Sequence, residues 1–201
     1  GGPGIDLMPH LLGWLLGVMD WPKVNWVSAR TFSKAEPGCP GYGPYGGGKR
    51  KPDGVFNVER RIQVYSQLAN GVTMNVNAAW AMHTDLERMG FRLIGSKATL
   101  LIERVWPIND GDDAKAVDTA VLYTTQMQGG RPWSSDRKFN PDNDPSTQDP
   151  FMGRTKTQPE VLDAIRTGRM PKTNIEQLLL IQEIIDASYC SADAAGEPVK
   201  F

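Results

Sequence analysis

The chain has 201 residues and a formal net charge of −1, and 40% of its residues are hydrophobic and 22% charged. This composition is typical of one soluble globular domain that is long enough to bury a core. Because lysine and arginine are interspersed with nearly equal numbers of aspartate and glutamate, the charge pattern does not indicate a nucleic-acid partner. The longest apolar run, LLGWLLGVM, is too short to cross a bilayer, and no basic segment precedes it as in a signal peptide.

The two cysteines give little functional information. Cys39 and Cys190 show neither C-x-x-C spacing nor a neighbouring histidine. They exclude a disulfide framework and argue against a metal site. They do not decide the compartment, so both the cytoplasm and the periplasm stay open.

The first third of the chain predicts a helix, a strand and a loop. Residues 6–19 are apolar nearly all round, which indicates a buried helix, and residues 23–33 are typical of a strand. A loop at about 34–56 contains GYGPYGG, which has the G-x-G-x-x-G spacing of dinucleotide-binding loops. That fingerprint needs a strand before it and a helix after it, and neither flank fits. We therefore interpret the spacing as part of a Gly/Pro-rich loop.

The clearest local signal is a β-hairpin at residues 61–80, RIQVYSQLANGVTMNVNAAW. Apolar residues alternate on both sides of Asn70-Gly71, a dipeptide typical of a type I′ turn. The predicted apolar face comprises Ile62, Val64, Leu68, Val72, Met74, Val76 and Trp80, and the opposite face comprises Arg61, Gln63, Gln67, Thr73, Asn75 and Asn77. One face therefore meets a core, and the other meets water, a partner or a ligand.

The rest of the chain predicts more strands and two helices. Strands are expected at 91–95, 98–105 and 120–125, and a long loop at about 128–157. Thr157 and Glu160 have the spacing of a capping box for a short helix that stops at Gly168, and Thr173 and Glu176 have it for a final helix. That final helix carries a stripe of Leu178, Ile181, Ile185 and Tyr189, and PVKF follows as a short strand.

These elements predict an α+β fold: an open-faced, mainly antiparallel β-sheet with helices packed on one face.

The first helix holds the main candidate for chemistry. Asp6 and His10 lie four residues apart and so project from one helix face, and Gly13 and Gly17 continue that stripe without bulk. Pro9 indicates the first turn of the helix, where a missing N–H costs little. The helix N-terminus favours an ionised Asp6 and disfavours a charged His10, so His10 could act as a neutral base.

A structural explanation of the same residues stays open. A helical histidine beside an aspartate is more often a structural hydrogen-bonded pair than a catalytic one. His83 is a weaker candidate, because it follows the hairpin and could simply begin a turn.

Several motifs, in order, resemble the C-terminal domain of the Gfo/Idh/MocA oxidoreductases. GGPGIDLMPHLLGWLLG is similar to the G-G-x-x-x-D-x-G-x-H-x-x-D-x-x-x-x-L-x-G segment that opens the central helix of that domain. QVYSQLANGVTMNVNAAW resembles its strand, Asn-Gly turn and strand, and FRLIGSKATLLIE resembles its Gly-Ser/Thr-x-Gly-x-Leu hairpin. TNIEQLLLIQEIIDASYCSADAAGEPVKF is similar to its closing helix.

The resemblance implies roles for the two helix residues. In that family the aspartate and histidine face the nicotinamide and the substrate. His10 would take or give the proton of a substrate hydroxyl, and Asp6 would orient His10 or bind the substrate, while hydride passes to or from NAD(P). The sequence departs from the family at Met8 and Ala98, where the family usually has glycine, and at Gly13, where an aspartate often follows the histidine.

The resemblance also implies segments of the family that residues 1–201 lack. These are a Rossmann half, a catalytic lysine from a Glu-Lys-Pro segment, and the first strand of the C-terminal domain. We therefore expect residues 1–201 to be a single C-terminal substrate-binding and oligomerisation domain, with the N-terminal dinucleotide-binding domain absent. NAD or NADP would be bound in the full-length protein, and we expect no cofactor and no turnover for this fragment.

The resulting hypothesis is an NAD(P)-dependent oxidoreductase that acts on a sugar, a polyol or a related derivative. Its expected partners are a carbohydrate-like substrate, the missing Rossmann domain and other copies of the chain bound through the open sheet face. Two alternatives stay open: an NAD-assisted glycoside hydrolase, and a binding or dimerisation module without catalysis.

Overall fold

The computed structural model describes residues 2–33, 57–80, 86–107, 117–128, 131–139 and 154–201. They belong to two units, one formed by Gly1–Thr84 with Ile175–Phe201 and the other by Asp85–Asn174. No helix within the described ranges is long and apolar enough to span a bilayer.

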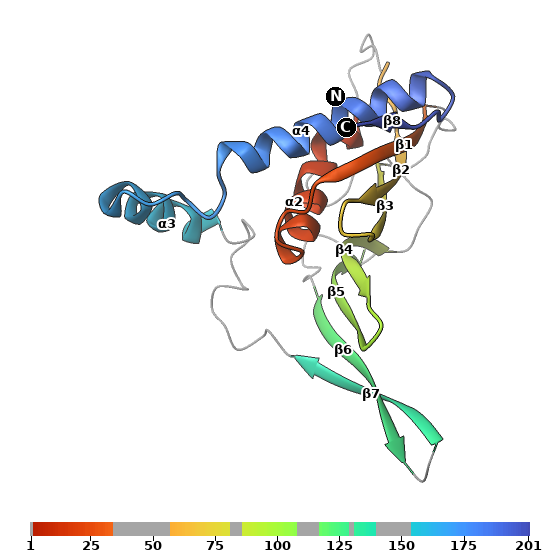
Figure 1. Cartoon of the computed structure of the whole chain (residues 1–201), viewed down its shortest axis with the longest axis vertical. Coiled ribbons are helices and arrows are strands. Elements are labelled where there is room, and N and C mark those ends of the chain that lie inside the picture. The colour runs from red at the N-terminus through yellow and green to blue at the C-terminus, as the bar shows by residue number, and fades with distance from the viewer. Residues whose placement is uncertain (1, 34–56, 81–85, 108–116, 129–130, 140–153) are drawn as a thin grey trace. The chain divides into compact units, whose positions relative to one another are not determined.

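The first unit is a four-stranded antiparallel sheet with helices on one face, called sheet A here (Figure 1). Its strand order is β3-β2-β1-β8. Its elements are α1 (Pro3–Asp6), α2 (Met8–Val18), β1 (Val24–Phe32), β2 (Arg61–Leu68), β3 (Thr73–Ala79), α4 (Ile175–Asp193) and β8 (Val199–Lys200). The predicted hairpin and the short C-terminal strand are therefore confirmed.

The inner face of sheet A carries the core because its side chains alternate. The residues that alternate toward this face on β2 and β3 are nearly all fully buried: Ile62, Val64, Ser66, Leu68, Met74, Val76 and Ala78. They pack with Met8, Leu12 and Leu16 from α2 and with Ile181, Ile184 and Ile185 from α4.

Several details of the predicted elements were wrong. The first helix is buried on one face and not all round, since Trp14 and Val18 are exposed. Val72 belongs to the turn of the hairpin and is exposed, and Leu178 lies on an exposed part of α4. Trp80, predicted for the apolar face, is partly exposed at the end of β3.

The hairpin turn is not of type I′. That turn needs positive φ at both central residues, and here Gly71 has φ +83° while Asn70 is not among the residues with positive φ. Gly71 N–H donates to the Leu68 carbonyl at 3.0 Å, and the Asn70 side chain accepts from Val72 N–H at 3.2 Å. The glycine therefore serves a three-residue loop, and the asparagine closes a local side-chain turn.

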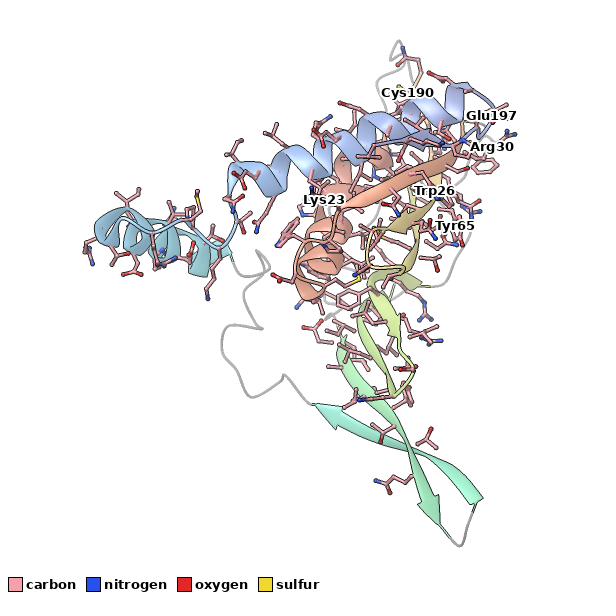
Figure 2. The ribbon with its side chains drawn as sticks, in the orientation of Figure 1. Lys23, Trp26, Arg30, Tyr65, Cys190 and Glu197 are labelled. Atoms are coloured by element: carbon pink, nitrogen blue, oxygen red, sulfur yellow. The ribbon has the colours of Figure 1, made fainter. Side chains whose placement is uncertain are left out.

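The outer face of sheet A, called the open face here, is polar as predicted, and it also carries aromatic side chains that the sequence analysis did not place there. Trp26 on β1 and Tyr65 on β2 lie side by side with ring centroids 5.5 Å apart (Figure 2). Trp26 Nε1 donates to Gln67 Oε1 at 3.1 Å, and the Arg61 guanidinium lies 5.8 Å from the centre of the Phe32 ring.

The second unit contains a second antiparallel sheet, called sheet B here, with strand order β4-β5-β6-β7. Its elements are β4 (Leu86–Ile94), β5 (Ala98–Pro107), β6 (Val117–Gln128), β7 (Arg131–Phe139) and α3 (Arg154–Thr167). The three predicted strands of this region are confirmed, and the α+β class with it, but the strands form two sheets and not one.

The loop predicted at 128–157 was wrong in part. It contains β7, which pairs with β6, and α3 begins at Arg154, so Thr157 lies inside the helix and does not cap it. Glu160 instead accepts from Arg169 Nη1 at 2.7 Å and from Lys172 N–H at 3.1 Å. The predicted stop is confirmed, since Gly168 has φ +67° directly after the helix.

Candidate functional site

The predicted site residues lie where two short helical segments meet. α1 ends at Asp6, Leu7 keeps right-handed dihedral angles (φ −99°, ψ −36°), and α2 begins at Met8. Pro9 lies in the first turn of α2, as predicted, and has no N–H to continue the hydrogen-bond pattern of α1. Because the backbone stays helical through Leu7, Asp6 and His10 remain about one turn apart. Both side chains are exposed.

Asp6 is held by a residue that the sequence placed in the core. Trp80 Nε1 donates to Asp6 Oδ2 at 3.1 Å. Within the described ranges, no hydrogen bond joins Asp6 to His10, so the predicted pair shares a helical face without direct contact. The indole N–H of Trp80 is an uncharged donor, so this hydrogen bond does not pair the Asp6 carboxylate with a positive charge.

A buried carboxylate anchors the start of α1. Glu59 is 8% exposed, and its Oε1 accepts both the backbone N–H of Gly4 at 3.0 Å and the hydroxyl of Tyr189 at 2.6 Å. Burial, followed by the hydrogen bond and the charge of Glu59, raises the pKa of the Tyr189 phenol well above its usual range. Tyr189 therefore acts as a hydrogen-bond donor at physiological pH.

Two glycines allow Glu59 and Tyr189 to lie close to the start of α1. A Cβ on Gly4 would lie 2.6 Å from the Tyr189 hydroxyl oxygen, and a Cβ on Gly2 would overlap the Glu59 carboxylate. The glycines of the predicted stripe have more room, because a Cβ on Gly13 or Gly17 would be 3.9 or 3.8 Å from its nearest described neighbour. Close approach therefore occurs at Gly2 and Gly4.

Sequence reasoning did not identify Glu59 and Tyr189 as anchors or Trp80 as the partner of Asp6. The available signal was the sequence GGPG, since glycines before a helix often mark close approach. His83, Cys39 and the GYGPYGG stretch lie outside the described residues. Cys190 is an exposed free thiol, and no group of three His, Cys, Asp or Glu side chains in the described ranges could hold a metal ion.

The helices and the open antiparallel sheet define an α+β domain of a known type. Solved structures with this fold are Gfo/Idh/MocA-type oxidoreductases, which confirms the fold that the sequence resemblance implied. No family model and no curated protein sequence matches the chain.

Three solved structures illustrate the likeness. An oxidoreductase domain protein from Kribbella flavida has a TM-score of 0.66 at 14% identity, with 97% of this chain and 48% of that one covered. The WlbA dehydrogenase from Bordetella pertussis, in complex with NADH and UDP-GlcNAcA, has a TM-score of 0.59 at 17% identity. The match covers 100% of this chain and 46% of that one. The UDP-N-acetylglucosamine 3-dehydrogenase GnnA from Acidithiobacillus ferrooxidans has a TM-score of 0.58 at 15% identity. The match covers 96% of this chain and 48% of that one.

At these identities the likeness is one of fold. The chain spans about half the length of the solved structures that it matches.

Proposed function

We propose that the chain is the C-terminal, substrate-binding and oligomerisation domain of an NAD(P)-dependent oxidoreductase that acts on a sugar, a polyol or a related derivative. The carrying observation is that Asp6 and His10 are exposed one helical turn apart, on the segment that resembles the family motif, with Asp6 held by Trp80. The fold supports the proposal, since it is shared with one dehydrogenase in complex with NADH and UDP-GlcNAcA and with another named for UDP-N-acetylglucosamine.

The described residues fit the substrate side of such a reaction. An exposed carboxylate can accept a hydrogen bond from a substrate hydroxyl, and an exposed imidazole can take or give the hydroxyl proton. In this proposal Asp6 binds and orients the substrate, and His10 is the proton acceptor or donor. A nicotinamide, held by the other half of the full-length protein, supplies or accepts the hydride when bound.

Two departures from the family motif, at Met8 and Gly13, lie on α2 beside this site. Met8 is fully buried against the core, so its side chain belongs to the packing of α2. A Cβ added at Gly13 would lie 3.9 Å from Ile181 Cδ1 of α4, so this position has room for a side chain. Both observations concern packing, and they are compatible with an enzyme domain and with a binding module whose site has been lost. They do not separate a dehydrogenase from an NAD-assisted glycoside hydrolase.

The test uses the full-length gene product that contains these residues. Dehydrogenase activity across a panel of sugars and polyols is measured together with NAD(H) and NADP(H) binding. We expect His10→Ala to reduce kcat by roughly 100-fold or more, the usual range for loss of a general acid or base, with dinucleotide binding unchanged. Asp186→Asn, which changes an exposed helical carboxylate on α4, is the control for Asp6→Asn and should leave activity unchanged.

The outcomes separate the candidate functions. Equal activity in the wild type and in both site variants would make Asp6 and His10 structural. Release of a sugar from a glycoside, with dinucleotide bound and no net oxidation, would identify the hydrolase. No activity and no dinucleotide binding would identify the binding module.

We propose that copies of the chain associate through the open face of sheet A. Its exposed residues include Tyr65 and Phe32 beside Arg61, residue types that are enriched in protein interfaces. Tyr65→Asp should lower the mass measured by light scattering at micromolar concentration. Val72→Asp, on the same hairpin but in its turn, is the matched control, and an equal mass for all three proteins would exclude this interface.

A further inference from the structure

We propose that Trp80 and Glu59 are positioning residues that fix the Asp6 carboxylate for the substrate. This inference rests on the proposed function. It starts from the attachment of both ends of α1 to one end of the β2–β3 hairpin. Glu59 lies just before β2, and Trp80 lies just after β3. The backbone N–H of Trp80 donates to the carbonyl of Arg60, the residue next to Glu59, at 2.8 Å. The two attachment points are therefore joined by a backbone hydrogen bond.

The attachment at the start of α1 is buried and close. Glu59 Oε1 accepts the Gly4 N–H at 3.0 Å, and the Tyr189 hydroxyl donates to the same oxygen at 2.6 Å. The backbone of Gly4 already lies so close to that hydroxyl that a Cβ added there would be 2.6 Å from its oxygen. The start of α1 therefore cannot shift toward Tyr189. Glu59 thus fixes the N-terminal end of a helix that is four residues long, and Asp6 is the last of them.

The attachment at the end of α1 acts directly on the side chain of Asp6, which would bind the substrate. An exposed aspartate samples several rotamers, and a hydrogen bond to one oxygen selects among them. The Trp80 indole bonds Oδ2 at 3.1 Å. Oδ1 can then accept a substrate hydroxyl in a fixed direction. Loss of such positioning lowers rates even when the reacting groups remain.

The kinetic test uses Trp80→Phe in the full-length protein, which keeps an aromatic ring and removes the N–H donor. We expect kcat/KM to fall roughly tenfold, as for loss of a hydrogen bond to a charged group, with dinucleotide binding unchanged. The double variant Asp6→Ala/Trp80→Phe should be no slower than Asp6→Ala, because Asp6→Ala already removes the carboxylate through which Trp80 acts. Trp21→Phe makes the same change at another partly buried tryptophan, which packs against the core, and should leave kcat/KM unchanged.

A second measurement reads the hydrogen bond without turnover. With ¹⁵N-labelled tryptophan, the indole N–H resonance of Trp80 is assigned by its loss in Trp80→Phe. In Asp6→Asn it should move, while the resonance of Trp26, which bonds Gln67 at the same 3.1 Å distance on the open face, should stay in place.

The role of Glu59 is tested by comparing a conservative variant with a truncated one. Glu59→Gln keeps an oxygen that can accept from Gly4 and Tyr189, so it should retain near-wild-type kcat/KM, while Glu59→Ala should lose activity at least as much as Trp80→Phe. Should Glu59→Ala fail to fold, Tyr189→Phe removes one donor from the anchor and should cause a smaller loss of the same kind.

The possible results are distinct. Wild-type activity in Trp80→Phe beside an inactive Asp6→Asn would overturn the positioning role and leave the proposed function standing. Losses in Trp80→Phe and Asp6→Ala that multiply in the double variant would also overturn it. Full activity in both Asp6→Asn and His10→Ala would overturn the proposed function, and the positioning role with it.

Discussion

The two units of the chain are built from similar strands but differ in what covers them. The buried core cluster lies entirely in the first unit, where α2 and α4 cover one face of sheet A. Where the structure describes side chains of the second unit, at 87–105, 117–126 and 157–174, the buried apolar side chains are Val121 and Ala164 alone. Residues 98–105 of β5 are each partly exposed on both faces of sheet B. A sheet thus gains a core from a second layer, and not from strand pairing alone.

The comparison bears on the candidate site. Asp6, His10, Glu59 and Trp80 all belong to the first unit, so the residues that carry the proposed chemistry are in the unit that holds the buried core cluster. Sheet B instead depends on backbone ladders and on cross-strand ion pairs such as Arg104 with Asp118. The two units should therefore respond differently to substitutions of the same kind.

The largest expected difference concerns leucine truncation. Leu12 on α2 is fully buried, so Leu12→Ala should lower the free energy of unfolding by about 3–5 kcal/mol. Leu101 on β5 is partly exposed, and Leu101→Ala should cost less than about half of that. Urea unfolding followed by circular dichroism measures both. Equal losses would mean that sheet B has a core as well packed as that of sheet A.

Three fully buried serines sharpen the description of the first unit. Ser191 Oγ on α4 accepts from the Ala29 N–H at 2.9 Å and donates to the Glu197 carbonyl at 2.7 Å. Ser191→Ala leaves the buried Ala29 N–H and the part-buried Glu197 carbonyl without this partner and should cost about 1–3 kcal/mol. The same unfolding experiment measures it. Ser188 Oγ bonds only the Ile184 carbonyl one turn earlier on its own helix, so Ser188→Ala should cost little.

Ser66 is the contrasting control. It is fully buried in β2, and its hydroxyl has no hydrogen-bond partner in the described structure. Removing an unpaired buried hydroxyl relieves its desolvation cost, so Ser66→Ala should be neutral or stabilising by up to about 1 kcal/mol. A loss as large as that of Ser191→Ala would contradict the assigned hydrogen bonds.

A smaller effect should distinguish ion pairs within sheet B. Arg104 Nε and Nη2 each donate to Asp118 at 2.5 Å, and the two side chains are 17% and 22% exposed. Because two parallel bonds hold a partly buried pair, Arg104→Gln should cost about 1 kcal/mol. Arg88 is 54% exposed and bonds Glu103 once, so Arg88→Gln should cost about half as much or less. Equal costs would show that burial does not set the strength of these pairs.

The sequence predicted what local patterns determine. Alternation over 61–80 identified the buried face of the β2–β3 hairpin, because every second side chain of a strand faces the same side. It failed at Val72, which continues the alternation but lies in the turn. It also failed at β7, since the sequence of that strand shows no apolar period and its pairing with β6 sets its conformation.

The site was predicted in part for the same reason. Asp6 and His10 are four residues apart, so their shared face follows from helix geometry. Trp80 is 74 residues from Asp6, and Glu59 is 130 residues from Tyr189, so these contacts depend on how sheet A and α4 come together. Periodicity carries no information on such pairs, which require the assembled fold.

The last predicted difference appears only at high pH and belongs to the first unit. The raised pKa of Tyr189 means that the folded protein holds this proton more tightly than the unfolded chain, whose tyrosine titrates near 10.0. The stabilisation is therefore complete below pH 10 and is lost as the pH rises through the folded-state pKa. The difference in free energy of unfolding between the wild type and Tyr189→Phe should be constant from pH 8 to 9.5 and shrink by pH 11. A constant difference over the whole range would mean that neither burial nor the hydrogen bond to Glu59 raises the pKa of Tyr189, and the anchor of α1 would lose one of its two bonds.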